Sequence, residues 1–392
     1  MRRERLGLYI LSFSSFLYAT VIGMVVTIVP IFSTKVGASQ AELGVIVAGY
    51  GATFVLCSLL IGRASDHFGR RNVLICGMLG YMISLLFFTL VTKPSDLALI
   101  RFFEGIVDVP FWVVPMALIA DAYPPEELGR SLGILFASQY AGMSVGPVIA
   151  GVLLELLSFP LPFYICTLIV LISIIVVLIA FQRKLFDHRT FPRYSQTLSV
   201  RFPRQVILSC IGLAVSSMCY GVVVSQLILY AIHLLGRELM IGALVTGYHM
   251  INAIVQVPMG RLSDIVWKRS IVVMSSFAVL GLAFFSVAAT TGVSTLIAAT
   301  LLIGACEGAI AIALTTSIMD AAPSKMRGLY SGFPNVSWGV GYFLGPLIAG
   351  FLAMRSAETA FMFAGAIALA MVPMGRIRLT TAKIVESSAG VG

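Results

Sequence analysis

Apolar stretches of about 20 residues, separated by short polar segments, run along the whole chain of 392 residues. A helix of this length crosses the roughly 30 Å hydrocarbon core of a bilayer. A spanning segment must also satisfy its own backbone hydrogen bonds, which favours helices. The pattern predicts an all-α integral membrane protein with twelve spanning helices, over residues 6–32, 42–62, 72–92, 96–120, 131–157, 160–182, 205–234, 239–260, 270–291, 294–319, 328–353 and 357–376.

Short motifs of the first half recur in the second half at an offset of 198 or 199 residues. A duplicated membrane bundle is typical of transporters, which place their site between the repeats. The recurring pairs are Gly49-Tyr50 and Gly247-Tyr248, Gly62-Arg-Ala-Ser-Asp66 and Gly260-Arg-Leu-Ser-Asp264, Asp121-Ala-Tyr-Pro124 and Asp320-Ala-Ala-Pro323, and Gly142-Met-Ser-Val-Gly146-Pro147 and Gly341-Tyr-Phe-Leu-Gly345-Pro346.

The repeat divides the chain into two predicted six-helix bundles, residues 1–182 and 205–392. A polar, basic segment over residues 183–204 falls at the boundary and is predicted to be a cytoplasmic linker. Because six is an even number of spans, both bundles keep the same orientation. They are then related by an axis along the membrane normal.

Composition and charge agree with a membrane protein. Hydrophobic residues make up 59% of the chain and charged residues only 11%, more apolar surface than a soluble domain can bury. The net charge of +9 reflects Lys and Arg gathered on one side of the predicted spans, which places both termini in the cytoplasm. We therefore expect a multi-pass protein of a plasma or inner membrane, and no nucleic-acid partner. The opposite side carries only Lys35, Lys93, Arg237 and Arg355.

A loop signature lies between the second and third predicted helices. Gly62, Asp66, Gly69, Arg70 and Arg71 fit the pattern G-x-x-x-D-x-x-G-R-R, and here the chain resembles the major facilitator superfamily. The resemblance covers the whole chain, with its twelve spans, its six-plus-six repeat and its basic central loop. It implies that these residues form a conformational latch on the cytoplasmic side. Alternatively, the two arginines only enforce the topology.

Two related segments extend the predicted latch. The second-half copy of the loop keeps Asp264 but has no clear equivalent of the glycine and arginine that follow in the first copy. After the fourth predicted helix, the segment that ends at Arg130 is similar to the family's P-E-x-x-R loop. Arg130 could reach Asp66 or Asp121, or it could be a solvated loop charge.

Small residues recur along the fifth and eleventh predicted helices. The fifth resembles the signature of the family's drug/proton antiporters, with Ala150 in place of one glycine. Small residues let helix backbones approach closely and proline kinks a helix, which suits a rocking interface. Ordinary helix packing is the alternative. The residues are Gly133, Gly142, Gly146, Pro147 and Gly151, and in the second half Gly341, Gly345 and Pro346.

Four Arg, Asp or Glu residues lie inside predicted spans and away from their ends: Arg101, Glu104, Asp108 and Glu307. The first three, at i, i+3 and i+7, share one helix face, and Asp108 and Glu307 lie near mid-membrane. A charge there costs at least about 2.5–3.5 kcal/mol. An Arg101–Glu104 ion pair would leave Asp108 and Glu307 without a cation, which favours protonation or a cationic ligand. We therefore predict a proton-coupling or substrate site at these four residues, and the resemblance implicates the arginine in proton coupling.

The resemblance also places the first, fourth, seventh and tenth helices around a cavity. It favours four aromatic residues as cavity lining: Tyr18, Phe111, Trp112 and Tyr220. His249, Asn252 and Gln256 share one face of the eighth predicted helix, although polar contacts between helices more often explain such residues. No nucleotide-binding loop or metal-ligand spacing is present in the sequence, so neither a cofactor nor a metal is expected.

Together these features predict a secondary active transporter that works by alternating access, and not an enzyme. The expected function is proton-coupled efflux of small amphipathic or cationic organic compounds by a monomer. The first helix lacks the acidic residue that many such pumps carry, which leaves the proton stoichiometry open. The alternative is proton-coupled transport of a specific metabolite such as a sugar or amine. A channel, a non-transporting sensor and a membrane enzyme fit the sequence less well.

Overall fold

A computed structural model describes residues 2–123, 125–182, 203–265, 269–322, 330 and 332–373 of the chain. Within these residues the structure is helical and contains no strand. The helices are α1 (Arg2–Lys35), α2 (Gln40–Phe68), α3 (Arg70–Phe88), α4 (Pro94–Ala122), α5 (Pro125–Leu156), α6 (Leu161–Gln182), α7 (Arg204–Val222), the π-helical turn η1 (Val223–Leu227), α8 (Ile228–Leu235), α9 (Glu238–Ile265), α10 (Arg269–Ala288), α11 (Val293–Asp320), α13 (Phe333–Ala353) and α14 (Ala357–Ala370).

This arrangement confirms the predicted all-α membrane fold. In the described residues, 11 helical segments are long and apolar enough to cross a bilayer, and α14 is a shorter apolar helix. One of these segments, Arg204–Leu235, joins α7, η1 and α8. The predicted linker at 183–204 lies outside the described residues except for its last two positions.

Two predicted spans differ in detail from the structure. The seventh is not a uniform α-helix, because the turn η1 (Val223–Leu227) interrupts it with five buried residues. The last was predicted over 357–376, but α14 ends at Ala370. Pro373 follows shortly after, and a proline ring clashes with a continuing helix. Apolar composition alone does not reveal either interruption.

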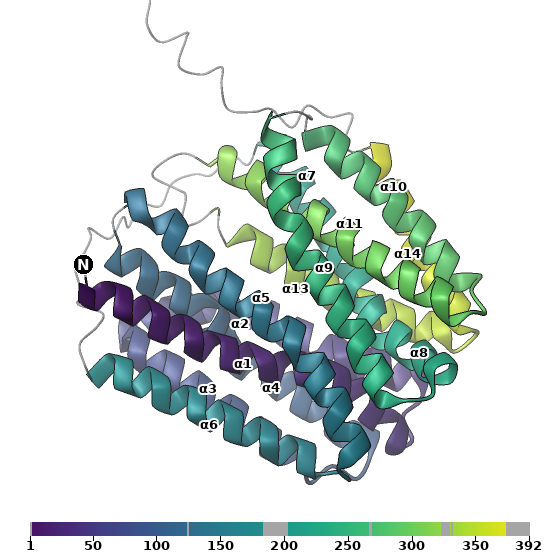
Figure 1. Ribbon diagram of the computed structural model, residues 1–392, viewed down its shortest axis with the longest axis horizontal. Helices are drawn as coiled ribbons and strands as arrows, with labels where there is room; N and C mark the ends of the chain where they lie inside the picture. The colour runs from purple at the N-terminus through teal and green to yellow at the C-terminus, as the bar shows by residue number, and fades with distance from the viewer. Residues whose placement is uncertain are drawn as a thin grey trace, which may run out of the picture.

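The helices fall into two sets, which we call the first half (α1–α6) and the second half (α7–α14). Figure 1 shows them as a purple-to-teal group and a green-to-yellow group. The sets contact each other chiefly where α2 packs on α13 and where α5 packs on α9. The turn η1 also contacts α1 and α2 across this boundary.

Glycines on α5 and α13 permit the closest packing inside each half. A Cβ at Gly142 or Gly146 would overlap backbone atoms of α1, including the carbonyl of Thr20. A Cβ at Gly341 or Gly345 would likewise overlap backbone atoms of α7. The repeated small-residue motif therefore lies at equivalent helix contacts in the two halves, where only a hydrogen fits.

The two halves are tightly joined at the end of the bundle away from the N-terminus. A Cβ at Gly151 of α5 would lie 2.7 Å from the carbonyl oxygen of Glu238 in α9. Beside this contact, Arg237 donates from Nε and Nη2 to the two carboxylate oxygens of Glu155, at 3.2 and 3.1 Å. The contact and the ion pair together clamp α5 to the start of α9.

The opposite end, which carries the N-terminus, is less closely packed. A Cβ at Gly62, Gly129 or Gly133 would meet no atom within 4 Å. Leu56 and Leu60, on the last turns of α2, are 71% and 60% exposed. Gly133, predicted as part of the packing motif, makes no close contact with another helix among the described residues.

Candidate functional site

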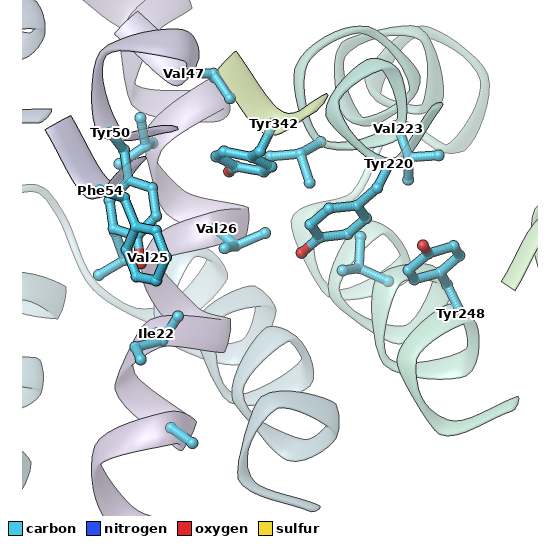
Figure 2. Packing of buried hydrophobic residues seen from close by; sticks show 14 of the residues in the cluster. Ile22, Val25, Val26, Val47, Tyr50, Phe54, Tyr220, Val223, Tyr248 and Tyr342 are labelled. Atoms are coloured by element: carbon cyan, nitrogen blue, oxygen red, sulfur yellow. The ribbon is translucent and has the colours of Figure 1, made fainter. Parts of the chain in front are cut away.

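A cavity of about 260 Å³ lies between the two halves. Both contribute aromatic side chains, and Figure 2 shows Tyr50 and Phe54 on one side with Tyr220 and Tyr248 on the other. The lining residues of the first half are Ile22, Val25, Val26, Tyr50, Phe54, Arg101, Glu104, Trp112, Tyr140 and Met143. Those of the second half are Leu213, Ser216, Ser217, Tyr220, Tyr248, His249, Asn252, Gln256, Glu307, Ala311, Thr315, Pro334, Asn335, Trp338 and Tyr342.

Glu307 of α11 is the acidic group on the second-half wall. It is 5% exposed, and its Oε2 accepts a hydrogen bond from the hydroxyl of Tyr248. Its Oε1 has no hydrogen-bond partner within the described part of the chain. A buried carboxylate oxygen without a partner is costly, so this atom needs either a proton or a ligand that donates to it.

Asp108 of α4 is the corresponding acid in the first half, and it is fully buried. Its Oδ2 accepts hydrogen bonds from the Tyr50 hydroxyl at 2.5 Å and from Nε1 of Trp112 at 2.9 Å. Tyr50 and Trp112 line the cavity, whereas Asp108 does not. The first-half acid is therefore linked to the cavity only through two aromatic side chains.

The two acids and their tyrosines follow the internal repeat. Tyr50 and Tyr248 are 198 residues apart, and Asp108 and Glu307 are 199 apart. In each half the glycine three residues before the acid packs against the backbone of the tyrosine. The Gly-Tyr repeat was visible in the sequence, but its pairing with the acids depends on how α2 meets α4 and how α9 meets α11.

Arg101 and Glu104 form an ion pair that has no copy in the second half. Nη1 of Arg101 donates to Oε2 of Glu104 at 2.7 Å, and both side chains are buried. The guanidinium also lies 4.7 Å from the ring centroid of Tyr50. The positions 199 residues later hold Thr300 and Ile303, so the second-half acid lacks an equivalent cation.

Two of the four aromatic residues predicted to line the cavity do not do so. Tyr18 and Phe111 are buried and stack with their ring centroids 4.1 Å apart, and Tyr18 also packs on Tyr81. Aromatic packing between α1, α3 and α4 holds these rings away from the cavity. Trp112 and Tyr220 do line it.

Several lining residues were not predicted. They come from helices that the resemblance did not place around the cavity, namely α2, α5, α9 and α13. Among them are Tyr50, Tyr140, Tyr248 and Tyr342. The repeated Gly-Tyr pair was the available signal for two of these tyrosines.

The predicted latch residues gather around Arg70 at the start of α3. Its guanidinium binds Asp66 at 3.0 Å and Asp121 at 2.8 Å, and it donates to Ser65 Oγ at 3.0 Å. Arg71 instead lies over the ring of Phe181 at 5.9 Å. These contacts all lie within the first half, and they tie the ends of α2, α3 and α4 together.

The second half does contain an equivalent of Arg70, contrary to the sequence-based expectation. Arg269 forms an ion pair with Asp320, 199 residues after the Arg70–Asp121 pair. The second loop has one more residue between its aspartate and this arginine, so the offset of 198 that relates Asp66 to Asp264 aligns Arg70 with Lys268 and hides the match.

The structure shows no latch contact for the other two predicted residues, Arg130 and Asp264, among the interactions it describes. Arg130 is exposed on α5, and both acids that it was predicted to reach are bound by Arg70. Asp264 lies near the end of α9, but its side chain is outside the described residues.

A twelve-helix bundle whose two halves enclose a cavity with buried acids has the architecture of a membrane transport protein. The sequence pattern of the Major Facilitator Superfamily matches residues 11–236 and 209–389, so the chain belongs to this superfamily. The resemblance seen in the sequence is thereby confirmed, and the protein is a transporter with the major facilitator fold.

Relatives of known name match most of the chain. Multidrug resistance protein 2 of Bacillus subtilis is 23% identical over 354 residues, covering 88% of this chain and 88% of the relative. The staphyloferrin B transporter of Staphylococcus aureus is 24% identical over 386 residues, covering 91% and 89%. An MFS-type transporter of Methanocaldococcus jannaschii is 22% identical over 342 residues, covering 85% and 87%.

Solved structures share the fold at lower identity. A bacterial homologue of the human lysosomal transporter Spinster, in an inward-facing and unoccupied conformation, matches with a TM-score of 0.73 and 14% identity. The match covers 96% of this chain and 95% of that one. At this identity the likeness concerns the fold alone.

Proposed function

We propose that this transporter exports small amphipathic or cationic organic compounds in exchange for protons. The observation that carries the proposal is Glu307, a buried acid on the cavity wall with one carboxylate oxygen that lacks a partner in the described structure. A proton and a substrate cation can each satisfy that oxygen, but not at the same time. Competition for one carboxyl group couples their movements.

The composition of the cavity supports a cationic, amphipathic substrate. Among the described residues that line it, Arg101 is the one Lys or Arg, and Glu104 neutralises it. Aromatic faces attract organic cations, and the aromatic lining includes Tyr220, Trp338 and Tyr342. The name of Multidrug resistance protein 2 agrees with a substrate class of this kind.

The difference in packing between the two ends of the bundle suits alternating access. One end is clamped by the Arg237–Glu155 pair, and at the other end Gly62, Gly129 and Gly133 meet no neighbouring atom among the described residues. We propose that both termini are cytoplasmic, in a plasma or inner membrane, so that this less closely packed end faces the cytoplasm. Rocking about the α2–α13 and α5–α9 contacts would then expose the cavity outside. We propose a monomer that uses the proton gradient and no bound cofactor.

A specific metabolite, such as a sugar or amine, is the second candidate substrate. The staphyloferrin B transporter, which is similarly distant, is named for a single compound. In the cavity, His249, Asn252 and Gln256 add neutral hydrogen-bonding groups, which a specific substrate would use.

The test is ethidium transport in proteoliposomes under an imposed pH gradient, with the wild type, Asp108→Asn and Glu307→Gln. Uphill movement that follows the gradient and is lost in Glu307→Gln supports the proposal. A folded wild-type protein that moves no dye under any gradient would contradict the multidrug function, and a panel of sugars and amines would then test the second candidate. Unchanged transport in both variants would remove these acids from the mechanism.

A further inference from the structure

One helix face of the cavity differs in chemistry from the wall opposite. His249, Asn252 and Gln256 occupy positions i, i+3 and i+7 of α9 and all line the cavity, so they form a continuous strip. With a rise of about 1.5 Å per residue, the strip is about 10 Å long. It begins beside Tyr248, which binds Glu307, and runs along α9 toward the end of the bundle that carries the N-terminus.

His249 is the best-defined member of this strip. It is 9% exposed, and its Nε2 has no hydrogen-bond partner in the described part of the chain. Its ring centroid lies 5.0 Å from that of Tyr248 and 5.9 Å from that of Tyr220. A buried imidazole nitrogen without a partner is costly, so a ligand group that bonds to it gains affinity.

The two amides of the strip are already oriented by each other. Nε2 of Gln256 donates to Oδ1 of Asn252 at 3.0 Å. This bond uses one donor and one acceptor, and each amide can make further hydrogen bonds. Beyond Tyr248, which binds Glu307, α9 therefore presents neutral hydrogen-bond donors and acceptors to the cavity.

The part of the lining that α1 contributes offers no comparable groups. The residues that α1 brings to the cavity are Ile22, Val25 and Val26, and Met143 comes from α5. Figure 2 shows Val26 of α1 pointing toward the side of the cavity that carries Tyr220 and Tyr248. The cavity thus has an apolar wall on α1 and a polar wall on α9.

We propose that the α9 strip is a hydrogen-bonding subsite, so that preferred substrates are amines with hydroxyl or carbonyl groups near the charged nitrogen and one apolar face. This inference rests on the proposed function, because it places the amine at Glu307. Lipophilic cations without hydrogen-bonding groups use Glu307 and the aromatic rings but not the strip.

Binding to the purified full-length protein tests the subsite separately from transport. Tritiated tetraphenylphosphonium is a cation without hydrogen-bonding groups. Propranolol is an amine with a neighbouring hydroxyl, and its analogue lacks this hydroxyl. Binding of tetraphenylphosphonium, and its displacement by each of the two amines, gives the affinities of the three ligands. The variants are His249→Phe, Asn252→Leu, Glu307→Gln and Met250→Leu. Met250 is a matched control, because it is next to His249 but 53% exposed and absent from the lining.

The wild type is expected to bind propranolol about fivefold more tightly than its analogue, the value of one neutral hydrogen bond. His249→Phe or Asn252→Leu should remove this preference and leave tetraphenylphosphonium affinity within about twofold, which also shows that the variant is folded. Met250→Leu should retain the preference. Glu307→Gln should weaken all three ligands.

Two results would overturn the inference in distinguishable ways. If tetraphenylphosphonium binding depends on Glu307 but propranolol and its analogue bind equally, the subsite is wrong and the proposed function stands. The same conclusion follows if both strip variants keep the preference. If the wild type binds none of the three ligands, the proposed function fails and the subsite fails with it.

Discussion

The two halves of this transporter carry the same acid–tyrosine pair in different surroundings. Asp108 is sealed behind Tyr50 and Trp112, next to the Arg101–Glu104 ion pair. Glu307 lies on the cavity wall, bound by Tyr248, and the positions that correspond to the ion pair hold Thr300 and Ile303. The pair therefore has the same contact in both halves but differs in its access to the cavity and in the charges beside it. Under the proposed function, the second half would bind the substrate cation and the first half would exchange a proton out of contact with substrate.

The largest expected effect comes from removing the charge of Glu307, the acid on the cavity wall. Glu307→Gln keeps the shape and the bond from Tyr248 but removes an interaction with a charged group worth about 1.5–3 kcal/mol. Tetraphenylphosphonium should bind about 10- to 100-fold more weakly. Equilibrium dialysis measures this. Asp108→Asn is the control: its affinity should stay within about threefold of wild type while gradient-driven transport is lost. Equal loss of affinity in both variants would contradict the proposal that the acids of the two halves have different roles.

The ion pairs of Arg70 and Arg269, at the end of the bundle that carries the N-terminus, should also differ between the halves. The side chain of Arg269 is 5% exposed and that of Arg70 is 19% exposed. Removal of the more buried arginine leaves Asp320 without its charged hydrogen bond, so Arg269→Ala should lower the free energy of unfolding by about 2 kcal/mol. Arg70→Ala should lower it by about 1 kcal/mol. Thermal unfolding in detergent ranks the two variants, and a reversed order would show that burial does not govern these pairs.

A third change makes the second half resemble the first. Thr300 is buried on α11 at the position equivalent to Arg101. Thr300→Arg adds a cation two helical turns before Glu307 and should weaken cation binding about tenfold, because the new charge repels a substrate cation at this wall. Thr300→Met adds similar bulk without charge and should have the smaller effect. If both variants weaken binding equally, the effect is steric and charge plays no part.

The smallest effect is expected at the clamp between the halves. Arg237 is 64% exposed, so its pair with Glu155 should contribute less than about 1 kcal/mol. Glu155→Gln should favour separation of α5 from α9 by a few-fold at most. The reaction rate of a cysteine introduced at Leu239, whose N–H donates to Glu155, with a membrane-impermeant maleimide measures this opening. High salt should mimic the substitution in the parent protein, and an effect larger than tenfold would show that the clamp is more than a surface pair.

Much of the fold could be predicted because lipid imposes simple rules. Spans must be about 20 apolar residues long and helical, so their number and order follow from the pattern. The acids Asp108 and Glu307 were also detectable, since charges in apolar stretches are rare. The end of α14 and the turn η1 were missed, because both are local departures within an apolar run.

The site was only partly predictable. Membership of a cavity wall depends on the rotation of each helix against its neighbours, and spacing along one helix does not determine that rotation. Tyr18 and Phe111 stack on each other instead of lining the cavity. The equivalence of Arg70 and Arg269 was hidden by one additional loop residue, and their matching acids revealed it in space.

The sequence by itself determined the membrane class, the repeat and the residue types at the site, because hydropathy and duplication are properties of the linear chain. Only the tertiary structure decided which acid meets the cavity, which tyrosine binds each acid and which end of the bundle is clamped. These depend on contacts between helices distant in the chain, such as α2 with α4 and α9 with α11. In such contacts a close approach permitted by glycine decides which side chains face one another.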